Sequence, residues 1–281
     1  MADVASSLQA IPGSRHVIRT GDGAGGQAMV MVDLLDDVVD RALEQVNRMG
    51  VPPDDVVLVR LDSIGPSVAR PLASVVWADL LSQAGANARP FARYLVFMVA
   101  AGVIAAFGVI YANVTLVVGA MALSPDTLPI TAAATALVLS RWLLAGRAVI
   151  ALCVGLGIAC IVGGLLTFVL NQLGALRTGF EVGSTFLQGL STVNVSTPIV
   201  AFAAGVAGML ALETRASSAV GVAISVTTIP ASAYLGVAAG VGEVGHAAGA
   251  LLVLGVNVVM LLVGGSSTLL VQRELARHHH P

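Results

Sequence analysis

One aspartate lies inside a long apolar region, and its chemistry is the first feature that the sequence offers. Residues 117–130 read Val-Val-Gly-Ala-Met-Ala-Leu-Ser-Pro-Asp-Thr-Leu-Pro-Ile, so Asp126 stands among hydroxyls and prolines. A charge at the centre of a bilayer costs at least about 2.5–3.5 kcal/mol, and acids placed there are functional by default. Because the apolar spans contain no Arg or Lys, a proton or a metal cation is the expected partner of Asp126.

Two matching stretches supply the candidate site. Residues 221–230 repeat the glycine, the hydroxyls and the proline of residues 119–129. Helices broken at such places offer oxygen atoms to a solute or an ion. The candidate substrate-binding or ion-binding residues are Gly119, Ser124, Pro125, Asp126, Thr127, Pro129, Gly221, Ser225, Thr227, Thr228 and Pro230. Two plainer interpretations stay open: Asp126 caps the helix that follows it, and the hydroxyls bond to their own backbone.

The composition places most of the chain in lipid. The chain has 281 residues, of which 57% are hydrophobic and 11% charged, and its mean hydropathy is +0.91. A soluble domain usually carries about 25% charged residues. The net charge of −2 and the lack of a basic stripe argue against a nucleic-acid partner. Cys153 and Cys160 lie about 10 Å apart along one helix, which is too far for a disulfide.

We expect a mainly α-helical, polytopic membrane protein with a small cytoplasmic domain of the ferredoxin-like α/β type before it. The expected parts are a disordered tail at 1–14, the α/β domain at 15–64, a linker at 65–92, a transmembrane domain at 93–271 and a cytoplasmic tail at 272–281. The tail contains three histidines, His278 to His280, which are not expected to bind a metal.

The expected α/β domain contains three strands and one helix. Strands at 16–19 and 28–32 precede a helix that Asp33 caps and that ends near Arg48. A strand at 56–61 then pairs in parallel after the crossover. Residues 21–26 match Gly-x-Gly-x-x-Gly, but a strand rather than a helix follows them. This context predicts a loop and not a dinucleotide site.

The linker contains an amphipathic stretch at 71–83. It either lies along the cytoplasmic membrane surface or packs on the soluble domain, and the sequence does not decide between the two.

Six apolar spans follow the linker, and about 20 residues are needed to cross a bilayer. The spans are 94–112, 114–139 with the break, 148–170, 198–212, 219–239 and 247–271. Six alternating crossings put seven arginines on one side, namely Arg89, Arg93, Arg141, Arg147, Arg215, Arg273 and Arg277. The opposite side holds Arg177, Glu181 and Glu243. The positive-inside rule then places both termini in the cytoplasm, at a bacterial inner membrane.

Three spans in each half imply two halves of opposite direction. Inverted three-helix repeats, with broken second and fifth helices, are typical of secondary transporters whose sites lie near the midplane. Gly155, Ala159 and Gly163 form a stripe at spacing four. The stripe favours close helix packing within or between protomers, and we expect a homo-oligomer.

The chain also resembles a known family of bacterial membrane proteins, the domain-of-unknown-function-389 family. The residues that carry the resemblance are Val117-Val-Gly-Ala-Met121 with Pro125 and Pro129, Ser140-Arg-Trp142 with Arg147, Ala203-Ala-Gly-Val-Ala-Gly208, and Gly221-Val-Ala-Ile224 with Pro230. The strand-helix-strand before Val76-Trp77 is similar to a domain of actinobacterial members, so the resemblance covers about residues 28–271.

This resemblance implies a membrane location and names no substrate. Family members commonly have Ala-Pro-Leu-Met-Gly-Pro where this chain has Ser124-Pro-Asp-Thr-Leu-Pro129. The resemblance therefore implies that the break belongs to the family and that Asp126 belongs to a subgroup.

Two functions remain from the sequence. The first is a secondary transporter or channel for a small solute or ion, with its site at the paired breaks. The alternative is a membrane-anchored regulatory or scaffold protein whose cytoplasmic domain binds a ligand or partner. No hydrolase motif and no second intramembrane acid accompany Asp126, so we expect no enzyme and no cofactor. The expected partners are the lipid bilayer, a small solute or ion, and further copies of the chain.

Overall fold

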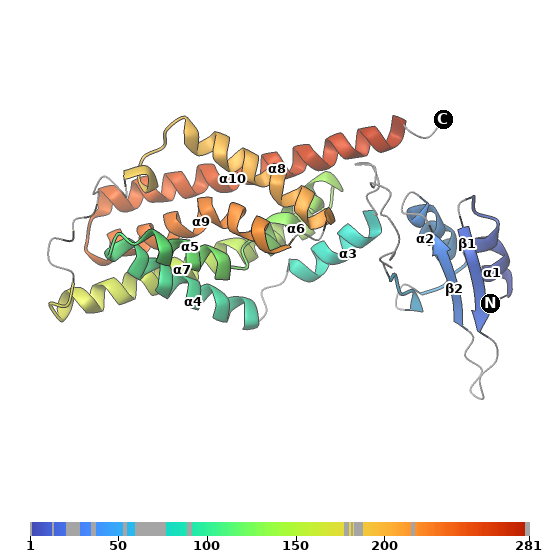
Figure 1. Ribbon diagram of the computed structural model, residues 1–281, viewed down its shortest axis with the longest axis horizontal. Coiled ribbons are helices and arrows are strands. Elements are labelled where there is room, and N and C mark those ends of the chain that lie inside the picture. Colours follow the sequence, from blue (N-terminus) through green and yellow to red (C-terminus); the bar gives the residue numbers. More distant parts are fainter. Residues whose placement is uncertain are drawn as a thin grey trace. The chain divides into compact units, whose positions relative to one another are not determined.

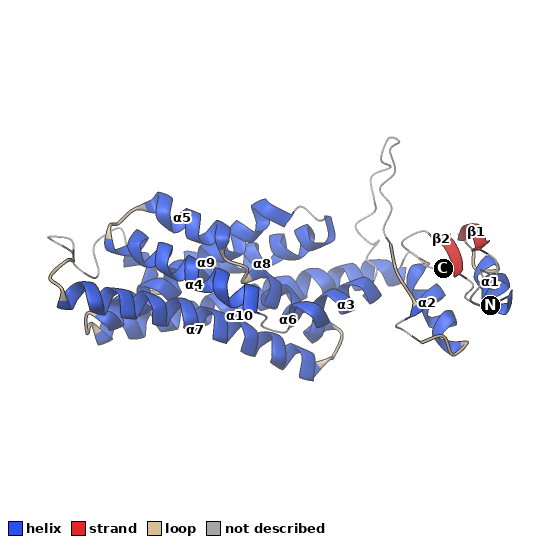
Figure 2. Cartoon of the chain, turned by 90° about the horizontal axis from the view of Figure 1, so that it is seen from below, coloured by secondary structure: helices blue, strands red, loops and turns tan. Residues whose placement is uncertain are grey.

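The computed structural model describes residues 2–12, 14–20, 29–34, 38–52, 55–59, 77–88, 92–176, 180, 182, 188–214 and 217–278. The chain forms two compact units, of which the first comprises residues 1–80 with 272–281 and the second residues 81–271. Helices dominate the second unit, and the described strands belong to the first (Figures 1 and 2).

The first unit packs two helices on one face of a strand hairpin. Its elements are α1 (Ala2–Gln9), β1 (Ser14–Thr20), β2 (Met29–Leu34) and α2 (Val39–Arg48). The strands pair antiparallel, with Ile18 opposite Met31. Alternate residues of β2, Val30 and Val32, pack against a small core that includes Leu8 of α1 and Val46 of α2. The other face of the hairpin leaves Ile18, Met29 and Met31 exposed.

Several expectations for this unit are wrong. Residues 1–14 contain α1, whose Leu8 is buried, rather than a disordered tail. The helix begins at Val39 with Val38 as its N-cap, and Asp33 belongs to β2. Residues 56–59 form no strand, so the parallel pairing and the ferredoxin-like arrangement are not seen there. The physical reason is local: β2 satisfies its backbone against β1, its neighbour in the sequence.

Three predicted features of the first eighty residues are not tested by the structure. The glycine loop at 21–26, the end of the expected strand at 60–61 and the start of the amphipathic stretch at 71–76 lie outside the described residues.

A helix or a bent helix pair occurs at every predicted span. The further helical elements are α3 (Trp77–Asn87), α4 (Ala92–Ile110), α5 (Val114–Leu123), α6 (Thr127–Val138), α7 (Trp142–Gln172), η2 (Gln188–Leu190), α8 (Ser196–Thr214), α9 (Ser217–Gly240) and α10 (Val244–His278). Among the described residues, α4, α7 and α10 are long and apolar enough to cross a membrane. The pair α5 and α6, bent by 54°, makes a fourth such segment. These helices are consistent with a membrane protein.

The expected amphipathic stretch at 71–83 ends inside α3. Ala84, on α3, and Ala88, just after its end, are buried in one cluster with Ala132 and Ala133 of α6 and Ala148 of α7. Both residues follow the stretch, so its placement along a lipid surface or on the soluble domain stays a prediction.

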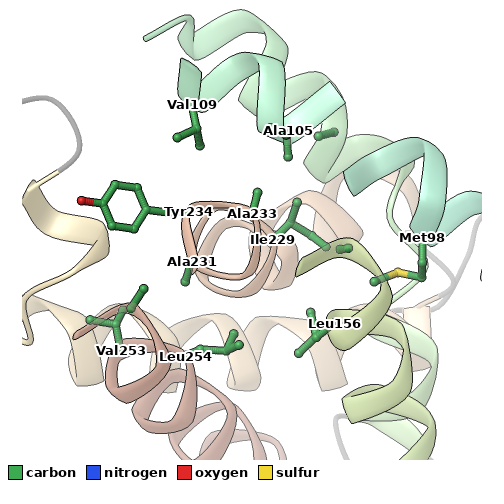
Figure 3. Close-up of a cluster of buried hydrophobic side chains, with 14 of the residues drawn as sticks. Met98, Ala105, Val109, Leu156, Ile229, Ala231, Ala233, Tyr234, Val253 and Leu254 are labelled. Atoms are coloured by element: carbon green, nitrogen blue, oxygen red, sulfur yellow. The ribbon is translucent and has the colours of Figure 1, made fainter. Parts of the chain in front are cut away.

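α9 runs through the helical unit between α4, α5, α7 and α8 (Figure 1). Ile229, Ala231 and Tyr234 point from this one helix in different directions (Figure 3), and all three belong to one buried cluster with side chains of α4, α7 and α10. α9 is continuous, with Pro230 inside it. The expected break in the fifth span is therefore absent, and only the second span is broken.

Small residues let these helices approach closely. A Cβ built on Gly155 of α7 would overlap the Tyr94 hydroxyl, and one on Gly102 of α4 would lie 2.8 Å from the Cα of Ala159. One on Gly163 would lie 3.5 Å from the Cβ of Ala106. The predicted stripe thus packs α7 against α4 within one chain. On the other side of α7, Gly236 of α9 lies against the carbonyl of Cys160.

Gly236→Ala should destabilise the protein, because its new methyl group would overlap the backbone of α7. We expect a loss of about 1–3 kcal/mol, which is typical of overpacking. Gly157→Ala is the matched control on α7, where a Cβ meets nothing within 4 Å; it should gain about 0.5–1 kcal/mol from helix propensity. Thermal unfolding in detergent measures both. Equal effects of the two variants would contradict this account of the α7–α9 contact.

Candidate functional site at the break between α5 and α6

Two prolines set the break and its geometry. α5 ends at Leu123, and Ser124 is extended, with φ −73° and ψ 128°. The residue before a proline is pushed toward this conformation, and Pro125 has no N–H for the carbonyl of Met121. Pro129 is the third residue of α6, a position where a missing N–H costs little. The sequence therefore stops one helix and starts another within three residues.

Asp126 occupies the N-cap position before α6, but its side chain does not cap the helix. Its side chain makes no capping hydrogen bond, so the capping interpretation is wrong. The carboxylate, which is fully buried, instead accepts a hydrogen bond at Oδ1 from Ser225 Oγ and one at Oδ2 from Thr228 Oγ1. Both donors belong to α9. The one acid of the apolar spans thus joins the first half of the chain to the second.

The helical period of α9 presents both donors together. Ser225 and Thr228 are three positions apart, so their side chains lie on the same helix face. Both are fully buried. A break in α9 at this point would separate the two hydroxyls, so the continuity of the helix is what allows them to meet one carboxylate.

Ser124 completes the surroundings of the carboxylate. Its hydroxyl lies within hydrogen-bonding reach of Asp126 and also 3.5 Å from Sδ of Met98 on α4. Nearby, the hydroxyl of Tyr94 donates to the carbonyl of Ala151 at 3.2 Å. The structure therefore brings Ser124, Asp126, Ser225 and Thr228 together.

Other predicted site residues lie elsewhere. The hydroxyl of Thr227 donates to the carbonyl of Ile224 of its own helix at 2.9 Å. Thr127 is half-buried, and its carbonyl accepts from Thr131. Gly119 lies on the exposed side of α5. Of Gly221 only its place in α9 is described.

The prolines form the framework of the site rather than its surface. Pro129 and Pro230 are buried and Pro125 is half-buried. Because a proline offers a ligand no side-chain polar atom, these residues act through the backbone shape that they impose.

Sequence reasoning missed Asn257 of α10. Its side chain is buried, and its Nδ2 donates to the carbonyl of Thr227 at 2.5 Å. This bond supports α9 from the side of α10, three residues before Pro230. The available signal was one amide in the middle of an otherwise apolar stretch, Val256-Asn257-Val258.

The electrostatics of the site favour a positive charge. No basic side chain of the described chain forms an ion pair with Asp126. The carbonyl end of α5 also points into the break and carries about half a negative charge, which the amino end of α6 offsets. No group of three or more His, Cys, Asp or Glu residues that fits a metal ion occurs among the residues the structure describes.

The comparison with protein families decides what kind of chain this is. Residues 121–263 match the family described as "Domain of unknown function (DUF389)". The chain belongs to this family. The matched range of this DUF389 member begins just before the break and includes Asp126, Ser225, Thr228 and Asn257. Searches of the curated proteins and of the solved structures found no match.

Loss of the hydrogen bond that Thr228 donates to the Asp126 carboxylate should destabilise this DUF389 member. Thr228→Val keeps the side-chain shape but removes a donor to a buried charge, and we expect a loss of about 1.5–3 kcal/mol. Thr227→Val is the adjacent control, and it should change stability by less than about 1 kcal/mol because that hydroxyl bonds to its own helix. Thermal unfolding in detergent compares the two. A larger loss of stability in the Thr227 variant would contradict the assignment of the hydrogen bond to Thr228.

Proposed function

We propose that this protein is a secondary transporter or channel for a small solute or ion, with its site at the α5–α6 break. The supporting observation is the fully buried carboxylate of Asp126, which accepts hydrogen bonds from two hydroxyls of the opposite half. Two neutral donors do not cancel its charge. In an apolar surrounding, an uncompensated charge is costly, so the carboxylate takes up a proton or a cation. Binding and releasing that charge is the step that we assign to Asp126.

The proposal includes six membrane crossings with both termini in the cytoplasm of a bacterial inner membrane. α8 and α9 have 19 and 24 residues, and about 20 residues suffice for a crossing. Arg93 in the first turn of α4, Arg141 just before α7 and Arg147 near its start are exposed. In this arrangement they share the cytoplasmic side, as the positive-inside rule requires.

The proposal also includes an inverted repeat of α4–α7 and α8–α10. Asp126 and Thr228 lie 102 positions apart in the chain, and so do Gly119 and Gly221 at the start of the two similar stretches. With the two glycines aligned, Asp126 corresponds to Thr228, whereas with Pro129 and Pro230 aligned, which lie 101 positions apart, it corresponds to Thr227. Corresponding residues of a two-fold pair touch each other only at the axis, and transporter sites lie at such repeat interfaces. The contact of Asp126 with Thr228 supports the repeat under the glycine alignment.

We also propose that the protein is a homo-oligomer embedded in the lipid bilayer. We propose no catalytic role and no cofactor. The rival hypothesis is a regulatory or scaffold protein, in which the first unit binds a ligand or partner and the helices serve as an anchor.

Flux through reconstituted protein distinguishes these hypotheses. Vesicles that contain a trapped pH-sensitive dye receive inward gradients of protons, NaCl or KCl, and uptake of radioactive Na⁺ is followed in parallel. Wild-type protein should move at least one of these ions. Asp126→Asn should reduce that flux by about tenfold or more, because it removes the charge that holds the ion.

Thr167→Val provides the control for this experiment. Thr167 is buried on α7 and its hydroxyl donates to the carbonyl of Gly163 at 2.8 Å, far along the helix from the break. Its variant should keep the flux. If wild-type vesicles do not differ from empty ones for all three ions, or if Asp126→Asn keeps full flux, the scaffold hypothesis gains.

A further inference from the structure

We propose that the break binds one dehydrated alkali cation, Na⁺ or Li⁺ in preference to K⁺, in contact with Ser124, Asp126, Ser225 and Thr228. This inference rests on the proposed function, because it names the ion that the site uses. Four observations carry it: the single charge, the donor atoms, the helix end and the tightness of the packing.

The charge of the site fits a monovalent ion. Among the described residues, Asp126 is the acid that contacts these hydroxyls, and no basic side chain forms an ion pair with it. One positive charge therefore neutralises the site. A divalent ion would leave one positive charge in apolar surroundings, where an unpaired charge is costly.

The donor atoms are all oxygens. Two carboxylate oxygens of Asp126 and the hydroxyl oxygens of Ser225 and Thr228 lie together, with that of Ser124 in reach. A hydroxyl that donates its hydrogen to the carboxylate keeps its lone pairs. It can therefore contact a cation without giving up that bond. Oxygen ligands suit hard cations, whereas soft or transition metals prefer sulfur and imidazole.

The backbone at the break adds an oxygen atom to these side-chain ligands. The last turn of α5 ends at Leu123, directly before Ser124. The carbonyl of Met121 cannot receive the usual helical hydrogen bond because Pro125 has no N–H. Carbonyl ends of interrupted helices coordinate Na⁺ or H⁺ in transporters with this kind of break. The same prolines that bend the span thus leave one backbone carbonyl, that of Met121, without its helical donor.

The packing sets the size of the ion. Asp126, Ser225 and Thr228 are fully buried, Ser124 is 7% exposed, and the two α9 hydroxyls contact the carboxylate directly. Such a cluster has no space for the water shell of a hydrated ion. Mg²⁺ gives up its water reluctantly. Among alkali ions, the small Na⁺ and Li⁺ need less separation of α6 from α9 than K⁺ does.

Thermal unfolding of the purified full chain in detergent tests the binding directly. NaCl, LiCl, KCl and choline chloride are titrated at constant total ionic strength. We expect Tm to rise by about 3–5 °C for each tenfold increase in Na⁺ or Li⁺ once the site is more than half filled. KCl should give a smaller rise, and choline chloride none.

Three variants test whether the rise of Tm with Na⁺ comes from binding at the break. Asp126→Asn should unfold at a Tm that does not depend on Na⁺. Ser225→Ala, which keeps the carboxylate, should shift the Na⁺ response to about tenfold higher concentration; it provides the test if the aspartate variant does not fold. Thr167→Val, distant from the break, should keep the wild-type response.

Two outcomes overturn the inference: a Na⁺ response no larger than that of choline, or a Na⁺ response that Asp126→Asn retains. The first outcome combined with Asp126-dependent proton flux in vesicles would leave the proposed function in place with a proton as its ion. A specific Na⁺ response in a protein that moves no ion would instead support the binding site and remove the transport function.

Discussion

A carboxylate that is withdrawn from water inside an apolar bundle must find hydrogen-bond donors and a positive charge, and the helical unit is built around this requirement. Asp126 accepts hydrogen bonds from two hydroxyls of α9, 99 and 102 positions further along the chain. At the start of α6 its side chain makes no capping hydrogen bond. The two halves of the chain are therefore held together by a polar contact at their centre.

Close helix packing makes this contact possible. Glycines bring the backbone of α9 against α7, as at Gly236 and the carbonyl of Cys160. Pro230 removes one helical hydrogen bond from α9, yet the helix continues. Neighbouring helices can support such a helix by bonding to its backbone. Asn257 does this when it donates to the carbonyl of Thr227.

The two halves respond differently to similar sequences. In the first half, Pro125 and Pro129 stand four positions apart and Ser124 is extended, so the span divides. In the second half a single proline follows Ile229, which keeps its helical conformation inside α9. One proline within a long helix produces a local defect, whereas two remove successive donors around the same turn. The asymmetry leaves the carboxylate on the broken side and its hydroxyl donors on the continuous side.

In the α/β unit, the local sequence predicts some strands correctly and one strand wrongly. The sequence predicts strands at 16–19 and 28–32, where β1 and β2 occur. The continuous apolar run at 56–59, also predicted as a strand, forms none. A strand needs a partner with a free edge, and partner choice depends on tertiary contacts that a short apolar run does not encode.

The sequence by itself determined where each apolar helix lies, where the second span breaks, and that an acid with oxygen-rich neighbours occupies that break. These features depend on composition and on proline, whose effects are local. Tertiary structure alone decided that Asp126 bonds across to α9, that Thr228 rather than Thr227 reaches it, and that Asn257 supports α9. These choices depend on the rotation of one helix about its axis against another. Because neighbouring residues of a helix point about 100° apart, that rotation is set by the packing of all the surrounding helices.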